Sequence, residues 1–332
     1  MSNILDIMRR HPANPIISPA DYPGVREVFN PSPVEYNGKT ILLLSMIFKQ
    51  NTCGGETRVA ESDDGINFTI ADEPFIKLQG MPFPFNYYYK HIIDNRVTKI
   101  DDTYYILTPV GNDVFSAPAT VLGSTRDFKT YEVMDIITLP VNRGASLFPE
   151  KIGGKYCKLD RPGGGSNATF PLGGDIWFSS SPDLLHWGQC RPVIQASFSW
   201  GSQKIGPTPP IKTRHGWLVI IHGVVPAGGD VGTYHIGAML LDLEEPWKVL
   251  GVTQKPLLSP EMPYEKHGHV SEVVFPCGAI ADFKTDTLKL YYGGADTNIC
   301  LATGSILAII DACLGRVPED KLTPGKPRLE FA

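Results

Sequence analysis

The sequence predicts an all-β fold and, within that class, a five-bladed β-propeller. Three observations support this prediction. Glycine and proline are abundant, with 33 and 29 residues, and both are spread along the chain, as many short strands joined by tight turns require. A polar turn followed by an apolar strand occurs five times, and a Ser/Asp-rich turn that ends in an aromatic residue follows four of these copies. An irregular β-sandwich is the alternative that the same strand content leaves open.

The first repeated element is a tight hairpin turn that leads into an alternating or apolar strand. In the first copy Asn37-Gly38 precedes the strand 41–44, and in the last copy Asp286 precedes the strand 288–292. The three turns between them lie at residues 101–103, 153–154 and 214–216. Two hairpins per unit, at a spacing of roughly 50 to 70 residues, are typical of four-stranded blades around a central axis. Five copies therefore predict five blades.

The second repeated element caps a hairpin and ends in an aromatic side chain. Its clearest copy begins with Ser181-Pro182-Asp183 and ends at Trp187. The other copies lie at residues 62–68, 124–131 and 242–247. Because Ser and Asp side chains accept hydrogen bonds from the backbone that follows them, this element predicts a capped turn with the aromatic ring packed between neighbouring sheets. Helical periodicity is convincing only near residues 306–314, which argues against a parallel α/β sheet.

Composition excludes several classes of partner. The formal net charge is −5 and the isoelectric point is about 5.9, so no basic face for nucleic acid or anionic lipid is indicated. No apolar run approaches the ~20 residues that span a bilayer, and the polar N-terminus does not resemble a secretory signal. The six cysteines are scattered without a CxxC motif, as expected of reduced thiols. We expect one cytoplasmic domain over residues 1–332, with no nucleic-acid or membrane partner.

Polar residues stand out at one or two positions in each repeat. In a propeller the inner strands of all blades converge at the mouth of the central channel, so site residues are expected to be spread over the whole chain. The candidates are Asn30, Arg58, Asp94, Arg143, Arg161, Lys204, His222 and Asp296. Taken singly, each also has an ordinary structural interpretation: an arginine in a surface ion pair, a histidine in the core, or a carboxylate at a strand end.

Five sequence blocks occur together in a specific order and spacing. They are Asn14-Pro15-Ile16, residues 147–151, Arg161-Pro162, residues 234–246 and residues 291–297. Each block is weak alone, but together they resemble glycoside hydrolase family 130, the β-mannoside phosphorylases and related mannosidases, over nearly the whole chain. The resemblance implies a five-bladed propeller, in agreement with the count of repeats.

The resemblance also implies a role for each candidate. Asp94 falls on the position of the single catalytic acid of the family. The phosphate-binding positions correspond to Arg143, Arg161, Lys204 and His222, and the positions that hold the mannosyl ring correspond to Asn30, Arg58 and Asp296. One departure stands beside the acid. The family often has Asp-Pro-Arg where this chain has Asp94-Asn95-Arg96, so the rigidity that a proline supplies is missing here.

These residue types suit phosphorolysis. Inverting glycoside hydrolysis uses an acid and a base that activates water, whereas phosphate is already a nucleophile and needs cations to position it. The expected reaction is inverting phosphorolysis of a β-1,2- or β-1,4-linked manno-oligosaccharide to α-D-mannose 1-phosphate. In the family that the chain resembles, the proton reaches the leaving oxygen through a mannose hydroxyl. A β-mannosidase of that family and a non-catalytic glycan-binding propeller are the two alternatives.

The expected ligands are a β-mannoside and inorganic phosphate. No cofactor is expected, since phosphate is a co-substrate. His267 and His269 flank Gly268, but no accompanying Asp or Glu pattern supports a metal site. The family commonly forms homo-oligomers, which makes a homo-oligomer possible, but the sequence leaves the oligomeric state open.

Overall fold

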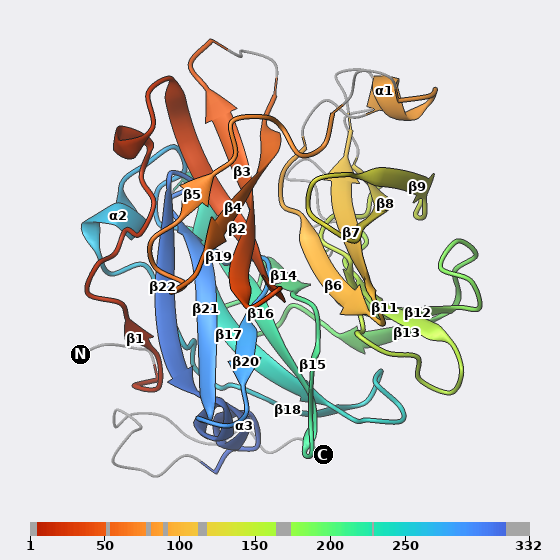
Figure 1. The fold of residues 1–332 in the computed structure, drawn as a ribbon. Helices are drawn as coiled ribbons and strands as arrows, with labels where there is room; N and C mark the ends of the chain where they lie inside the picture. The colour runs from red at the N-terminus through yellow and green to blue at the C-terminus, as the bar shows by residue number, and fades with distance from the viewer. Residues whose placement is uncertain are drawn as a thin grey trace.

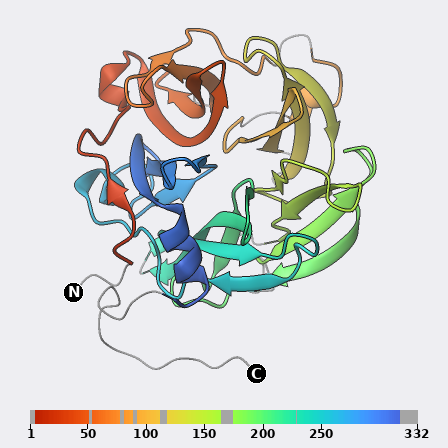
Figure 2. The same cartoon turned by 60° about the horizontal axis from the view of Figure 1, so that its bottom comes forward.

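The computed structural model describes residues 5–50, 54–77, 81–88, 92–111, 118–163, 174–227 and 229–316 (Figure 1). Five antiparallel sheets stand in a ring around one axis (Figure 2). The predicted five-bladed β-propeller is therefore confirmed. Within the described part of the chain, no helix has the length and apolar character that crossing a membrane requires.

The first three blades follow one another along the chain, each with four strands in sequential order from the axis outward. Blade 1 contains β2 (Val25–Tyr36), β3 (Lys39–Phe48), β4 (Glu56–Ser62) and β5 (Thr69–Ile70). Blade 2 contains β6 (Arg96–Ile100), β7 (Thr103–Val110), β8 (Ala119–Thr125) and β9 (Glu132–Ile136). Blade 3 contains β10 (Ser146–Leu147), β11 (Tyr156–Asp160), β12 (Ile176–Ser181) and β13 (Gly188–Ile194).

Blades 4 and 5 have inner strands in two pieces. In blade 4 both β14 (Lys204–Pro207) and β15 (Ile211–Thr213) pair with β16 (Gly216–Ala227), and β17 (Gly229–Leu241) and β18 (Val249–Val252) follow. Pro207, Pro209 and Pro210 lack the backbone N–H groups that would continue the ladder, which accounts for this break. Blade 5 contains β19 (Val274–Pro276), β20 (Ile280–Asp282), β21 (Thr287–Gly294) and β22 (Asn298–Ser305), and β1 (Arg9–Arg10) pairs with β22 at its outer edge.

The helices are short and lie at the ends of the sheets (Figure 1). They are η1 (Pro19–Asp21), α1 (Phe85–Tyr88), α2 (Pro263–Lys266) and α3 (Ile306–Cys313). The N-terminus of α3 is capped by the Ser305 hydroxyl, which accepts a hydrogen bond from the Ala308 N–H. This helix confirms the periodicity near residues 306–314.

Both repeated elements have the predicted structure. The hairpin turns place Asn37, Asp101 and Asp286 at φ 49°, 53° and 54°, a left-handed conformation that Asn and Asp tolerate better than most residues. In the second element, the Asp183 carboxylate accepts hydrogen bonds from the backbone N–H groups two and three residues later, those of Leu185 and His186. Asp64, Asp127 and Asp242 accept from the same relative positions.

The aromatic residue that ends this element packs against a neighbouring blade, as predicted. Phe68 of blade 1 meets Tyr291 of blade 5 edge-on, with ring centroids 6.0 Å apart. Trp247 of blade 4 meets Phe178 of blade 3 at 5.3 Å. Each capped turn therefore also contributes to the contact between two blades.

The hydrophobic core consists of layers between adjacent blades. On β3, Leu42 and Leu44 pack toward blade 5, whereas Ile41 and Leu43 pack toward blade 2. A middle strand is thus buried on both faces, which explains why residues 41–44 are a continuous apolar run rather than an alternating one.

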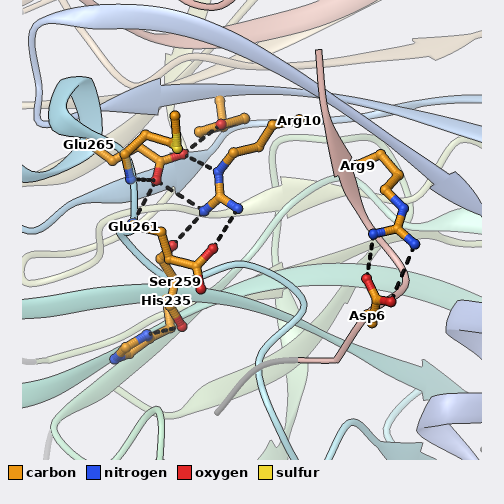
Figure 3. Close-up of polar contacts among 9 residues, drawn as sticks. Asp6, Arg9, Arg10, His235, Ser259, Glu261 and Glu265 are labelled. Carbon is orange, nitrogen blue, oxygen red and sulfur yellow. Dashed lines mark hydrogen bonds and ion pairs between the residues drawn. The ribbon is translucent and has the colours of Figure 1, made fainter. Parts of the chain in front are cut away.

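The ring closes where β1 joins blade 5, and Arg10 holds it there. Its guanidinium donates to both carboxylate oxygens of Glu265, at 2.8 and 3.0 Å, and to Glu261 at 2.9 Å (Figure 3). Glu265 is fully buried and also accepts a hydrogen bond from the Tyr292 hydroxyl at 2.7 Å. The adjacent Arg9 pairs instead with Asp6 at the surface, where both side chains are mostly exposed.

We predict that Arg10→Ala destabilises the protein far more than Arg9→Ala. Arg10→Ala leaves the buried Glu265 carboxylate without its cation, which typically costs about 3–5 kcal/mol. Arg9→Ala removes an exposed pair worth about 0–1 kcal/mol. Denaturant unfolding of the two variants measures the difference, and equal losses would show that Arg10 does not hold the closure.

Candidate active site

The backbone of Asp94 is held by its neighbours at the inner end of blade 2. Asp94 lies two residues before the start of β6 and has φ 57°. Its N–H donates to the Ser45 hydroxyl at 3.0 Å, and its carbonyl accepts from the Arg96 guanidinium at 2.6 Å. Arg96 is itself buried and also donates to the Pro207 carbonyl of blade 4 at 3.2 Å. Blades 1, 2 and 4 thus fix the residue together.

The resemblance described above implies a proline at the position of Asn95, and Asn95 fixes the backbone in another way. Its buried side-chain amide donates to the Thr57 hydroxyl at 2.6 Å and accepts from the Thr108 hydroxyl at 2.6 Å. Thr57 in turn donates to the Ile92 carbonyl at 2.8 Å. Hydrogen bonds to two strands therefore supply the restraint beside Asp94 that a proline ring would supply.

The Asp94 carboxylate bridges blades 1 and 3. Its Oδ1 accepts from the Asn30 side-chain amide at 2.7 Å, and its Oδ2 accepts from the Arg143 guanidinium at 2.5 Å. Burial raises the pKa of Asp94, but the charges of Arg143 and Arg96 and these two hydrogen bonds outweigh it and hold the pKa below its usual value. The carboxylate is consequently ionised in the unliganded chain.

Arg143 and Arg161 form a pair of neighbouring cations. Arg161 donates from Nε to the Arg143 carbonyl at 2.6 Å, and the Arg143 N–H donates to the Arg161 carbonyl at 3.3 Å. Gly144, at φ 93°, lies between Arg161 and Arg96, and a Cβ there would be 3.3 Å from the Arg96 guanidinium. Burial, together with the charges of Arg143 and Arg96, lowers the pKa of Arg161 to about 10.

A buried network fixes the segments that carry these arginines. The Asn142 amide donates to the Asp160 carboxylate at 3.0 Å and accepts from the Arg161 N–H at 3.3 Å. Asp160 is neutralised by Lys158 at 2.5 Å. Lys158 and Asn142 therefore compensate the charge of Asp160, so this carboxylate is not a counter-charge for Arg143 or Arg161.

Lys204 and His222 both lie against the ring of Tyr234 in blade 4. The Lys204 ammonium lies 4.8 Å from the centroid of Tyr234, and the His222 ring stacks on it at 6.2 Å. Burial, with the charges of Arg161 and Arg143, lowers the pKa of Lys204 to about 8. Burial and the same arginines lower the pKa of His222 well below its usual value. Gly206 opposite His222 leaves room for the ring, because a Cβ there would be 2.3 Å from it.

Asp296 lies in the turn between β21 and β22, at φ 46°. Burial and then the charge of Asp94 raise the pKa of Asp296 to about 7. Asn30 has φ 49° and lies at a bulge within β2. Three candidates from three blades, Asn30, Asp94 and Asp296, therefore share a left-handed backbone, a conformation that clusters at functional sites.

Arg58 is placed differently from the other candidates. It lies on β4, where its guanidinium pairs with Glu56, donates to the Ala71 carbonyl at 3.2 Å and stacks over Phe48 at 5.0 Å. None of the contacts found in the described part of the chain joins it to Asp94. The structure brings the remaining candidates together, namely Asn30, Asp94, Arg143, Arg161, Lys204, His222 and Asp296.

Two further residues that contact these candidates, Arg96 and Tyr234, were not selected from the sequence as site residues. Tyr234 begins one of the quoted sequence blocks, and Arg96 follows Asp94 in another conspicuous motif, so both lay within visible signals. Their roles depend on contacts with distant parts of the chain, since Arg96 meets Pro207 of another blade and Tyr234 meets Lys204 within blade 4. Among the described residues, no group of three or more His, Cys, Asp or Glu side chains is arranged to hold a metal ion.

Unpartnered buried polar atoms concentrate around this group. Within the described ranges, four buried side-chain atoms lack a hydrogen-bond partner: Glu27 Oε2, Asn30 Oδ1, Gln203 Oε1 and His222 Nδ1. Two belong to candidate residues, and Gln203 precedes Lys204. Because buried polar atoms are normally satisfied, these atoms indicate a ligand site.

Comparison with known proteins places the chain in one group. A family model described as beta-1,4-mannooligosaccharide phosphorylase matches residues 4–314. The chain is 34% identical over 313 residues to the beta-1,4-mannooligosaccharide phosphorylase of Ruminococcus albus, a match that covers 92% of this chain and 90% of that protein. It is 33% identical over 350 residues to the beta-1,2-mannobiose phosphorylase of Listeria innocua, with 87% and 94% covered.

A solved structure agrees with these relatives. The beta-1,2-mannobiose phosphorylase from Listeria innocua, in complex with beta-1,2-mannobiose, superposes on this chain with a TM-score of 0.80 at 33% identity. The superposition covers 92% of this chain and 99% of that one. Sequence and fold therefore point to the same proteins.

We predict that His222 makes stability fall as the pH falls below about 6.5. The unfolded chain takes up a proton at His222 in that range, whereas the folded chain keeps the ring neutral because its pKa is lowered. Stability is thus present above the unfolded pKa and is lost below it, by about 1.4 kcal/mol per pH unit for one proton. Urea unfolding between pH 7 and pH 5 should give a shallower slope for His222→Gln, and equal slopes would contradict the neutral histidine.

Proposed function

The chain belongs to glycoside hydrolase family 130 and is a mannoside phosphorylase, and we propose that its site cleaves a β-linked manno-oligosaccharide with inorganic phosphate and inversion at the anomeric carbon. The products are α-D-mannose 1-phosphate and a shortened sugar. In reaction class this is transfer of a hexosyl group to phosphate. The two relatives are named for β-1,4 and β-1,2 linkages, and either linkage is compatible with the proposal.

The cationic cluster is the observation that supports phosphate as the nucleophile. The pKa values of Arg161 and Lys204 are lowered to about 10 and about 8 by burial and by neighbouring positive charge, so the cluster repels itself in the absence of an anion. Within the described structure, the Arg161 guanidinium donates only to a backbone carbonyl, and Arg143 is 45% exposed. A phosphate dianion would relieve this repulsion and accept charge-assisted hydrogen bonds from both arginines.

The opposite side of Asp94 suits a neutral sugar. Asn30 Oδ1 is buried without a partner, and Asp296 offers a carboxyl group. Both are acceptors for hydroxyl groups, and a dianion would be repelled by a nearby carboxylate. We therefore assign the blade 1 and blade 5 side to the mannosyl ring and the blade 3 and blade 4 side to phosphate, with Asp94 between them.

Asp94 is the proposed general acid. As phosphate attacks the anomeric carbon, the bond from that carbon to the leaving oxygen breaks, and the oxygen takes a proton that originates on Asp94. The proton passes through a hydroxyl of the mannosyl ring, as the family resemblance implies. No carboxylate is required to activate the nucleophile, because phosphate is anionic when it binds.

An acid must be protonated before it acts, whereas Asp94 is ionised in the unliganded chain because of Arg143 and Arg96. Arg143 donates to Asp94 and is also a proposed phosphate ligand. Bound phosphate would share the charge of Arg143 and add negative charge beside Asp94, and both effects raise the pKa of the acid. Phosphate is thus proposed both to attack and to prepare Asp94 to donate a proton, which disfavours cleavage without phosphate.

We predict that cleavage of β-1,2- and β-1,4-linked manno-oligosaccharides requires inorganic phosphate and yields α-mannose 1-phosphate. The physical reason is the cationic cluster beside the acid. Product analysis by NMR, with and without phosphate, identifies the anomer and the linkage that is cleaved. Equal turnover in phosphate-free buffer with free mannose as product would support the β-mannosidase alternative, and no turnover of any mannoside would support a glycan-binding propeller.

We also predict that phosphate binding is accompanied by uptake of up to about one proton at Asp94. Calorimetric titration in buffers of different ionisation enthalpy measures the number of protons. Asp94→Asn is the control, since an amide cannot titrate and the protons exchanged by phosphate itself cancel in the comparison. This variant should also lose at least about 10²-fold in activity. The same proton number in both proteins would exclude phosphate-linked protonation of Asp94.

A further inference from the structure

Glu27 is a buried carboxylate with one oxygen left free at the edge of the candidate site. It lies on β2, the inner strand of blade 1, three residues before Asn30. Its side chain is 4% exposed, and Oε2 has no hydrogen-bond partner. An unpaired buried acceptor next to a ligand site is costly, and its retention calls for a partner that the unliganded chain does not contain.

The other oxygen of Glu27 is fully occupied. Oε1 accepts from the Arg26 guanidinium at 2.9 Å and lies 3.1 Å from His269 Nδ1. Arg26 and His269 are about half-exposed, so Glu27 lies one layer below the rim of the propeller. These contacts occupy Oε1, where Arg26 remains when His269 is removed, and they leave Oε2 as the atom available for a ligand.

The location of Glu27 places it on the sugar side of the site. The Val28 N–H, next in the chain, donates to the Thr297 carbonyl at 3.3 Å, and the His269 N–H donates to the Thr297 hydroxyl at 2.9 Å. Asp296 immediately precedes Thr297, and the charge of Glu27 contributes to the raised pKa of Asp296. Glu27 is therefore beside Asp296, on the blade 1 and blade 5 side that is assigned to the mannosyl ring.

The chemistry of the free atom selects its ligand. A carboxylate oxygen accepts hydrogen bonds and repels the phosphate anion, whereas the mannoside is neutral and carries several O–H donors. We propose that Glu27 is a further substrate-binding residue, whose Oε2 accepts a hydrogen bond from a hydroxyl group of the bound mannoside. The proposal rests on the mannoside phosphorylase function and extends the sugar side of the site by one residue.

Glu27→Gln tests the proposal with little change in shape. The amide oxygen can still accept from Arg26 and His269, but the other position becomes an N–H₂ donor that cannot accept from a hydroxyl. We expect kcat/KM for the mannoside to fall about tenfold or more, as for loss of a hydrogen bond to a charged group. KM for phosphate should change less than about twofold, since the proposed hydrogen bond is made to the sugar and not to phosphate.

His269→Ala is the matched control, because it removes a contact to Oε1 and leaves Oε2 untouched. It should keep kcat/KM for the mannoside within about twofold of the wild-type value. If His269→Ala reproduces the loss seen in Glu27→Gln, then Glu27 acts only as a support for the rim, and the proposal is overturned. Should Glu27→Gln fail to fold, Glu27→Asp keeps the charge but shortens the reach, and the same loss is expected.

Monodeoxy mannosides identify the hydroxyl and separate the two levels of the proposal. One deoxy substrate should cost the wild type about tenfold and cost Glu27→Gln almost nothing, because the hydrogen bond is already absent in the variant. Equal losses in both proteins for every deoxy substrate would refute the contact. If the wild type turns over no mannoside with phosphate, the proposed function itself is wrong. If the wild type is active and Glu27→Gln is equally active, only the role of Glu27 is wrong.

Discussion

Burial of both faces of every blade is the constraint on which the rest of the structure depends. The middle strands are apolar on both sides, as residues 41–44 illustrate, so no blade is complete until a neighbour covers each face. The requirement closes the sheets into a ring and brings β1 from the N-terminus to the edge of blade 5. The ion pair between Arg10 and the buried Glu265 then holds this last junction, and the inner strand ends of all blades meet at one place.

Convergence at the axis has an electrostatic consequence. Arg143, Arg161 and Lys204 are brought together with fewer counter-charges than they need, while Asp94 and Asp296 are buried nearby. The charges are segregated, with cations on blades 3 and 4 and acceptors on blades 1 and 5. A site with this division is arranged in advance for an anion and a polyol placed side by side, so little reorganisation is needed when both substrates bind.

The same site carries local costs that the surrounding fold tolerates. Asn30, Asp94 and Asp296 adopt left-handed backbone conformations, and Glu27, Asn30 and His222 keep unpartnered buried atoms. Hydrogen bonds from Ser45, Arg96 and the Asn95 network hold Asp94 despite its conformation. Left-handed residues also occur at hairpin turns such as Asn37, but at this site they coincide with unpartnered buried atoms, as expected where strain serves binding.

The sequence by itself determined the number of blades, the hairpin turns and the capped aromatic turns, because these depend on hydrogen bonds between residues close in the chain, as at Asn37 and Asp183. Its blocks also pointed to most of the residues that gather around Asp94. Only the tertiary structure decided that Asn30 lies at a bulge inside β2, that Arg58 pairs with Glu56, and that Arg96, Tyr234 and Glu27 belong near the site. The placements of Arg96 and Glu27 depend on contacts between segments far apart in sequence, such as that of Arg96 with Pro207. A local pattern carries no information about which charges the closed ring will place side by side.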